Sequence, residues 1–292
     1  MIEIKNLYHS LGTKSVLENV NITVKESTIT GLVGINGAGK TTLLRLISGI
    51  YTPDKGTIFY KGYPVDRPDV KEKIFFLPDD PFYNHSTTGA ELFKMYKSLY
   101  PSADHAVFMK NVELFGIDVK ARVRTFSKGM RRQLFVALAL SIKPELLLLD
   151  ESFDGLDPLA RLNFKKAVNS IVEENGTAVI IASHSLRELE DFCDKYIMID
   201  AKTVHSSGEI TEKVERYCKF QLAFTEEQNA ETYKELSPIS LEINGKFVRI
   251  VLEGTREENE PKLLAFNPVV MEEMRMDFEE VFISEAGRKE NK

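Results

Sequence analysis

Length, composition and charge place this chain among folded globular proteins. It has 292 residues, of which 43% are apolar and 28% are charged, so it can bury a sizeable core and is not disordered over most of its length. Its net charge of −6 comes from 38 basic and 44 acidic residues with no basic block, which argues against a nucleic-acid partner. The first residues do not form a signal peptide, and no apolar stretch approaches the roughly 20 residues that span a bilayer. Two cysteines are too few for a disulfide framework, which argues against a disulfide-stapled secreted domain.

The N-terminal half alternates between strand and helix patterns. Apolar and polar residues alternate over residues 2–7 and 20–24, which predicts half-buried strands, and residues 28–33 form a third predicted strand that is followed by glycine. From residue 87 to about 142 the apolar spacing is helical, and Thr88 with Glu91 has the spacing of a capping box. This order of elements predicts an α/β fold.

Two short apolar runs later in the chain predict the centre of a sheet. Residues 146–149 and 178–181 are wholly apolar and bounded, which is typical of parallel strands buried on both faces. Ligands bind at the carboxyl ends of such strands. Asp150 and Glu151 follow the first run, so we expect both carboxylates to lie at a ligand site.

A phosphate-binding loop follows the third predicted strand. Residues 34–41 read Gly-Ile-Asn-Gly-Ala-Gly-Lys-Thr and match the pattern G-x-x-x-x-G-K-[ST], which arises by chance roughly 0.01 times in a chain of this length. Glycines let the backbone N–H groups surround phosphate, and the N-terminus of the following helix adds positive potential. The lysine reaches the β- and γ-phosphates and the hydroxyl binds Mg²⁺. The predicted nucleotide-binding residues here are Gly34, Asn36, Gly37, Ala38, Gly39, Lys40, Thr41 and Thr42.

The acidic pair after the buried strand completes a hydrolytic site in this interpretation. Asp150 is expected opposite Thr41, where the two would hold Mg²⁺, and Glu151 is positioned to polarise the attacking water. Either acid alone could simply cap a helix. Both together, after a phosphate loop and in this order, favour a Mg²⁺-dependent ATPase.

At this point the sequence resembles the ATP-binding subunits of ATP-binding cassette (ABC) transporters over residues 1–210. Residues 125–130, Thr-Phe-Ser-Lys-Gly-Met, are similar to the signature sequence of that family. The resemblance implies a P-loop NTPase with a RecA-like core, an N-terminal antiparallel β part and a helical subdomain at about 84–142. It also implies that Ser127 and Gly129 contact ATP held by a second cassette, so that ATP closes a head-to-tail dimer and hydrolysis reopens it.

Two further positions resemble family motifs. Residues 155–158, Gly-Leu-Asp-Pro, are similar to the D-loop that signals across the dimer. His184 follows the buried run at 178–181 and resembles the switch histidine that contacts γ-phosphate, so Glu151 and His184 are the predicted catalytic residues. The other histidines receive no role.

The chain departs from the family pattern at two predicted contacts. Leu11 stands where the family places an aromatic ring under adenine, so stacking worth roughly 1 kcal/mol would be lost. Asp79, in Leu-Pro-Asp-Asp at 77–80, replaces the usual Q-loop glutamine and offers a shorter, charged ligand to Mg²⁺, directly or through water.

The last part of the chain has a different texture. Residues 1–210 contain 26 acids and 26 bases, whereas residues 211–292 contain 18 acids and 12 bases. Residues 239–243 and 246–252 flank Asn-Gly and predict a hairpin, in which Leu241 would oppose Val248 and Ile239 would oppose Ile250. We expect a small α+β accessory domain over 211–292, with a docking helix that carries Phe278, Val281 and Phe282.

Four classes of function compete for this sequence. The interpretation that we favour is an ATPase subunit on the cytoplasmic face of the cell membrane, which powers a separate permease of the ABC-2 exporter type. A soluble ABC protein usually carries two cassettes or a long coiled coil, and neither is present; a GTPase needs Asn-Lys-x-Asp, which is absent. A module that binds nucleotide without hydrolysing it stays open because of Leu11 and Asp79. The transported substrate and the choice between homodimer and heterodimer are not encoded in visible motifs.

Overall fold

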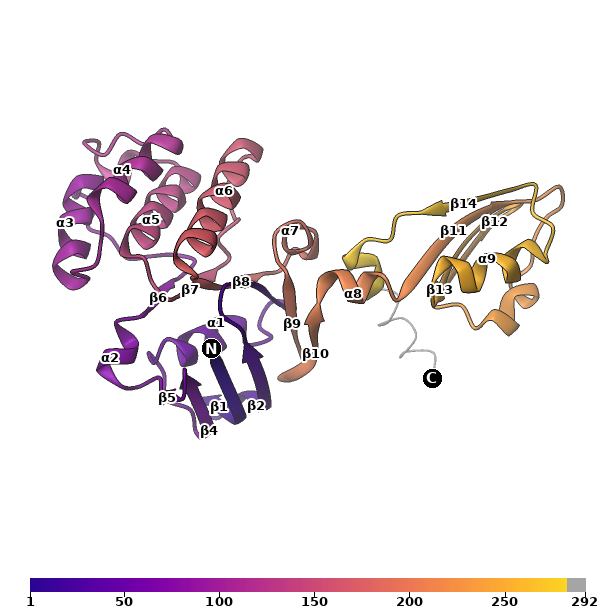
Figure 1. Cartoon of the computed structure of the whole chain (residues 1–292), viewed down its shortest axis with the longest axis horizontal. Coiled ribbons are helices and arrows are strands. Elements are labelled where there is room, and N and C mark those ends of the chain that lie inside the picture. The colour runs from indigo at the N-terminus through magenta and orange to yellow at the C-terminus, as the bar shows by residue number, and fades with distance from the viewer. Residues whose placement is uncertain (283–292) are drawn as a thin grey trace. The chain divides into compact units, whose positions relative to one another are not determined.

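The computed structural model describes residues 1–282, and they form two compact units (Figure 1). The first unit comprises Met1–Ser207 and the second begins at Gly208, three residues before the boundary expected from the change in charge. Residues 283–292 of the expected accessory domain lie outside the described residues. Each unit has its own hydrophobic cluster.

The first unit contains two sheets. A four-stranded antiparallel sheet has the order β2-β1-β4-β5, and a six-stranded sheet has the order β10-β9-β3-β8-β7-β6. In the second sheet β9, β3, β8, β7 and β6 pair in parallel. The strand bounds are β1 Ile2–Leu11, β2 Lys14–Val24, β3 Ile29–Val33, β4 Lys55–Tyr60, β5 Tyr63–Pro64, β6 Ile74–Leu77, β7 Leu146–Asp150, β8 Ala178–Ser183, β9 Lys195–Asp200 and β10 Thr203–Glu209.

Helices connect the parallel strands and form a separate helical part between β6 and β7. The helix bounds are α1 Lys40–Ile47, α2 Pro68–Lys71, α3 Gly89–Leu99, α4 His105–Leu114, α5 Lys128–Ile142, α6 Pro158–Asn175 and α7 Leu186–Glu190, with a 3₁₀ turn at Val123–Thr125. Thr88 and Glu91 form the predicted capping box at α3, because each side chain accepts a backbone N–H that the first helical turn leaves unpaired. The mixed α/β class, the antiparallel sheet and the helical part are confirmed.

Burial explains why β3, β7 and β8 lie at the centre of the parallel sheet. Every residue of these three strands is buried, and wholly apolar strands are stable only where both faces of a sheet are covered. Their carboxyl ends therefore converge on one edge. The phosphate loop, Asp150 and His184 lie at or directly after those three ends.

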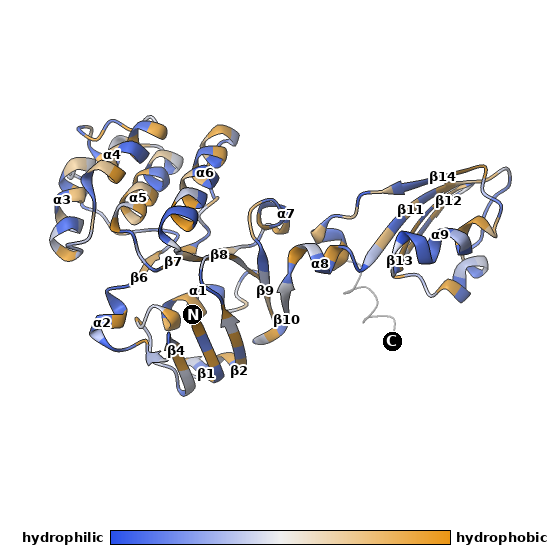
Figure 2. Cartoon of the chain, in the orientation of Figure 1, coloured by the Kyte–Doolittle hydropathy of each residue, from blue (hydrophilic) through white to orange (hydrophobic). Residues whose placement is uncertain are grey.

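The second unit is a four-stranded antiparallel sheet with the order β12-β13-β11-β14. Its elements are α8 Ile210–Val214, β11 Tyr217–Ala223, a 3₁₀ helix at Ala230–Leu236, β12 Ser240–Asn244, β13 Phe247–Glu253, α9 Arg256–Leu264 and β14 Val270–Met274. Figure 2 shows that most of α9 is hydrophilic, and its buried residues are Asn259 and Leu263. Phe278, Val281 and Phe282 lie in a short helical segment and are buried.

The predicted hairpin is present, but its predicted register is wrong. Leu241 pairs with Ile250, and Asn244 pairs with Phe247, so Gly245 and Lys246, not Asn-Gly, are the two turn residues. Gly245 has φ +58°, and a positive φ at the first central residue suits a type II′ turn, which favours glycine there. The partner of Leu241 thus lies two residues further along β13 than predicted, and a shift of two residues leaves the same side chains on the buried face.

Candidate functional site

The phosphate loop joins β3 to α1 in the form that the sequence predicts. Gly37 and Gly39 have φ values of +83° and +104°, which other residues adopt only with strain. A Cβ atom at Gly34 would lie 2.6 Å from the carbonyl oxygen of Ile199. Helix α1 begins after Gly39 without a side-chain cap or an acid in its first turn, so its N-terminus is available to an anion.

Lys40 folds back over this loop. Its ammonium donates to the carbonyl oxygens of Gly34 at 2.6 Å and Ile35 at 3.4 Å, and lies 3.7 Å from Glu151 Oε1. The lysine is buried, and a buried cation is stable only with such partners. This arrangement holds a positive charge at the loop where phosphate would enter.

Thr41 and Asp150 meet across the site, and their geometry fits a divalent cation. The Thr41 hydroxyl donates to Asp150 Oδ2 at 2.8 Å. Asp150 Oδ1 is buried and has no hydrogen-bond partner among residues 1–282, and an unpaired buried oxygen is costly. Burial, followed by the charges of Glu151 and Asp79, raises the pKa of Asp150. A Mg²⁺ ion would satisfy the free oxygen and offset this repulsion, since it prefers carboxylate and hydroxyl oxygens.

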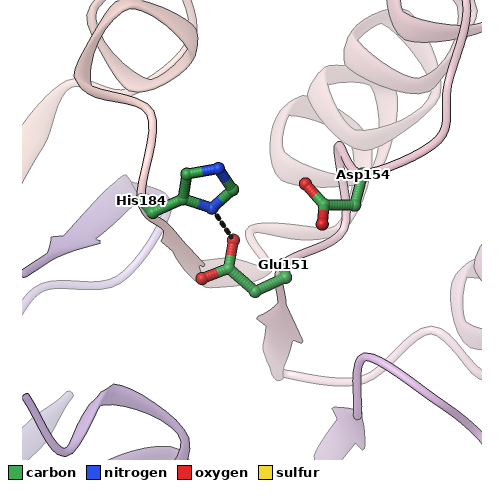
Figure 3. Close-up of side chains that lie close together, drawn as sticks. All are labelled: Glu151, Asp154 and His184. Atoms are coloured by element: carbon green, nitrogen blue, oxygen red, sulfur yellow. Dashed lines mark hydrogen bonds and ion pairs between the residues drawn. The ribbon is translucent and has the colours of Figure 1, made fainter. Parts of the chain in front are cut away.

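Glu151 and His184 form a close pair at the ends of β7 and β8 (Figure 3). His184 Nδ1 lies 2.9 Å from Glu151 Oε2, and this hydrogen bond is the main reason why the pKa of His184 is raised. Glu151 has φ +45°, an uncommon conformation for a side-chain-bearing residue that often marks functional sites. Asp154 completes a cluster whose ligand atoms lie within 4.8 Å of one another. The two predicted catalytic residues are therefore adjacent.

One cavity of about 720 Å³ contains most of the predicted nucleotide site. It is lined by residues of the phosphate loop, by the acids that follow β6 and β7, and by residues of β1, β2 and the turn after β9: Asn36, Gly37, Ala38, Gly39, Lys40, Thr41, Thr42, Asp79, Asp150, Glu151, Leu11, Lys14, Ser15, Val16, Ala201 and Lys202. Leu11 therefore lines the same cavity as the phosphate loop, and no aromatic ring is among the described residues that line it. Ala201 and Lys202, in the turn between β9 and β10, are contributors that sequence reasoning missed.

The signature residues lie at the start of α5. Ser127 caps this helix by accepting the backbone N–H of Met130 at 3.1 Å. A Cβ atom at Gly129 would lie 2.5 Å from the carbonyl oxygen of Gly155, so only glycine fits between the signature and the predicted D-loop. Neither Ser127 nor Gly129 is among the described residues that line the cavity around Lys40.

Arg132 is a further functional candidate that sequence reasoning did not find. Its side chain has an exposed fraction of 2%, and it donates to the Pro78 carbonyl, the Asp79 carbonyl and Asp79 Oδ1. One oxygen of Asp79, the expected Mg²⁺ ligand, therefore accepts from Arg132. The only visible signal was an arginine within the apolar part of α5, five residues after Ser127.

Comparisons with known proteins agree with this geometry. The family described as ABC transporter matches residues 17–154. The ABC transporter ATP-binding protein YtrB of Bacillus subtilis (strain 168) is 32% identical over 291 residues, which cover 99% of each chain. This chain belongs to the ATP-binding subunits of ABC transporters. The linearmycin resistance ATP-binding protein LnrL of the same organism is 31% identical over 74% of this chain and 71% of its own. The solved structure of an ATP-binding subunit of an ABC transporter is 26% identical, with a TM-score of 0.67, over 73% of this chain and 91% of that one.

Family membership fixes the core assignment. The chain is an ATP-hydrolysing ABC subunit with a P-loop NTPase fold, as the motifs predicted. Among residues 1–282 there is no helix of sufficient length and apolar character to pass through a bilayer. The roles of individual side chains are inferred from the geometry above.

Proposed function

We propose that this chain hydrolyses Mg²⁺·ATP to drive a separate membrane permease. The observation that carries the proposal is the convergence of Lys40, Thr41, Asp150, Glu151 and His184 at the ends of β3, β7 and β8. The phosphate loop supplies backbone donors and Lys40 supplies charge for the β- and γ-phosphates. Mg²⁺, when bound beside Thr41 and Asp150, neutralises phosphate charge.

The remaining two side chains carry the water chemistry. Glu151 is the general base that accepts a proton from water attacking the γ-phosphate, because it is the carboxylate beside Lys40 that does not bond Thr41. His184 hydrogen-bonds to Glu151 Oε2 and orients that carboxylate. The Glu151 side chain is partly buried, with an exposed fraction of 17%, and this lower local dielectric strengthens its interactions with Lys40 and His184.

A second cassette completes the site. Ser127 and Gly129 do not line their own chain's cavity among the described residues, and α5 has no acidic residue in its first turn. The N-terminus of this helix can therefore accept the γ-phosphate held by another cassette. Either a second copy of this chain or a different cassette would form the head-to-tail dimer.

The permease is proposed to be an integral membrane protein at whose cytoplasmic face this chain sits. The similarity to a linearmycin resistance ATP-binding protein supports an exporter, because ATP-driven removal of an antibiotic from its site of action is one way in which a transporter confers resistance. The transported substrate is selected by the membrane subunit, so the residues of this chain do not identify it.

The test is phosphate release by the purified chain with Mg²⁺·ATP. Lys40→Ala removes the buried cation and should lower turnover by at least about a hundredfold, as expected for loss of a preorganised charge at the transferred phosphate. Lys94→Ala is the matched control, since Lys94 is exposed on α3, and it should retain activity within twofold of wild type. Wild-type protein that binds ATP but releases no phosphate, alone or with its permease, would support a nucleotide sensor instead.

A further inference from the structure

The loop after β6 and helix α5 are tied together by one buried side chain. Arg132 makes three hydrogen bonds, at 3.0 Å to the Pro78 carbonyl, 2.6 Å to the Asp79 carbonyl and 2.5 Å to Asp79 Oδ1. A guanidinium that is almost fully buried needs a charged partner to offset its lost hydration. Within residues 1–282, Arg132 forms its ion pair with Asp79.

Asp79 occupies a boundary between two cavities. It lines the nucleotide cavity with Lys40, Thr41 and Asp150, and it also lines a second cavity of about 300 Å³ beside Arg132. Its side chain has an exposed fraction of 49%, so an ion in the nucleotide cavity can reach it. Because a carboxylate has two oxygens and Oδ1 is bound to Arg132, Oδ2 is the atom that can turn to the cavity.

The positive charges of Arg132 and of a divalent cation oppose each other's binding to Asp79. The described rim of the cavity holds the carboxylates of Asp79, Asp150 and Glu151, which attract a divalent cation. A guanidinium directly bonded to one of them repels the same cation and weakens the field of that carboxylate. The guanidinium of Arg132 therefore weakens the binding of the metal ion to Asp79. By thermodynamic linkage, the metal ion weakens the Arg132–Asp79 ion pair by the same factor.

We propose, building on the ATPase function above, that Mg²⁺ competes with Arg132 for the Asp79 carboxylate, so that Arg132 is a positioning residue that reports metal–nucleotide binding to α5. Without Mg²⁺·ATP, Arg132 draws the loop after β6 against α5. With it, the carboxylate turns to the metal and the guanidinium keeps its two carbonyl partners. The first turns of α5 are then held less tightly, and these turns begin at Ser127, where the second cassette's nucleotide is expected.

The experiment measures affinity for a fluorescent ATP analogue with and without Mg²⁺, in the full chain carrying Glu151→Gln to prevent hydrolysis. The dissociation constant without Mg²⁺ divided by the dissociation constant with Mg²⁺ measures how strongly the metal increases nucleotide affinity. This ratio does not depend on turnover. Asp79→Asn should reduce this ratio about tenfold, which is within the range usual for coupling between two ligands. Asp80→Asn is the control: Asp80 lines only the second cavity, and the ratio should stay within twofold.

The direction in which Arg132→Gln changes this ratio decides whether Arg132 and Mg²⁺ compete. Competition predicts that the ratio rises at least about threefold over that of Arg131→Gln, which removes the same charge one residue away. Arg131 bonds the Phe126 carbonyl instead of Asp79. A fall in the ratio like that of Asp79→Asn, or a ratio equal to that of Arg131→Gln, overturns the proposal.

Hydrogen exchange provides a second readout that does not require Arg132 to be replaced. In the chain carrying Glu151→Gln, kept at a concentration at which it stays monomeric, addition of Mg²⁺ to the ATP-bound protein should speed exchange at the amides of residues 131–135. Adding Asp79→Asn should abolish this change, while adding Asp80→Asn should keep it. An identical response with and without Asp79→Asn overturns the proposal even if Arg132→Gln does not fold. If the unsubstituted chain binds no nucleotide, it is the proposed ATPase function that fails, and the two failures are thus distinguishable.

Discussion

Replacement of Glu151 by glutamine isolates the chemical step from nucleotide binding. Glutamine has the same shape and can keep a hydrogen bond to His184, now 2.9 Å from Glu151 Oε2, but it cannot accept a proton from water. A positioned general base contributes roughly 10²–10⁴-fold, which is about 2.7–5.4 kcal/mol at 1.36 kcal/mol per tenfold. Hydrolysis should fall by that factor.

Binding should survive the same substitution. Glu151 Oε1 lies 3.7 Å from Lys40 Nζ, so removal of its charge frees the lysine for phosphate and removes repulsion from the phosphate oxygens. Unhydrolysed ATP should then accumulate between two cassettes, and dimer formation should increase with ATP concentration by mass action. Phosphate release and size-exclusion chromatography with ATP measure the two effects separately.

Asp154→Asn is the control for the general effect of a lost charge in this cluster (Figure 3). Asp154 lies in the group of three residues with Glu151 and His184, but it is not placed beside Lys40. The ATPase activity of Asp154→Asn should stay within tenfold of that of the wild type. Turnover of Glu151→Gln within tenfold of wild type, or an equal loss in Asp154→Asn, would refute the assignment of Glu151 as base. A monomer at saturating ATP would point to a different cassette as partner, or to a dimer that needs the permease.

The same substitution has a pH signature at His184. The hydrogen bond that protonated His184 donates to Glu151 raises the pKa of His184 above its ordinary value, so the charged pair stabilises the folded state below about pH 6.5, the unfolded pKa of histidine. That stabilisation is lost as pH rises through the higher folded pKa. In Glu151→Gln the pKa of His184, measured by NMR titration, should fall; an unchanged value would show that another group sets it.

Two further predictions concern the ends of the molecule. Leu11 cannot stack on a base as an aromatic ring does, so GTP should be hydrolysed within a hundredfold of ATP; a larger preference for ATP in competition assays would show that another group reads the base. A fragment that ends at Gly208 should still bind nucleotide, because the first unit has its own hydrophobic cluster. Precipitation of this fragment would show that the second unit is needed for the first unit to fold.

The sequence by itself determined the features that depend on local chemistry and order along the chain. The phosphate loop is a contiguous run whose glycines are needed for positive φ at Gly37 and Gly39. Wholly apolar strands ending in Asp150 and preceding His184 predicted a buried parallel sheet, and the family resemblance followed from the spacing of these motifs. The cap at Thr88 was readable for the same reason, since a capping box spans only four residues.

Tertiary structure decided what depends on contacts between distant segments. The register of the hairpin depends on whether Asn244 or Gly245 is the first of the two turn residues. In the structure Asn244 pairs with Phe247, so Gly245 is the first turn residue. The tie between Asp79 and Arg132 joins residues 53 positions apart, and nothing local to either residue predicts it. Burial is the physical reason: once α5 packs against the loop after β6, the guanidinium is cut off from water and must take the nearest carboxylate.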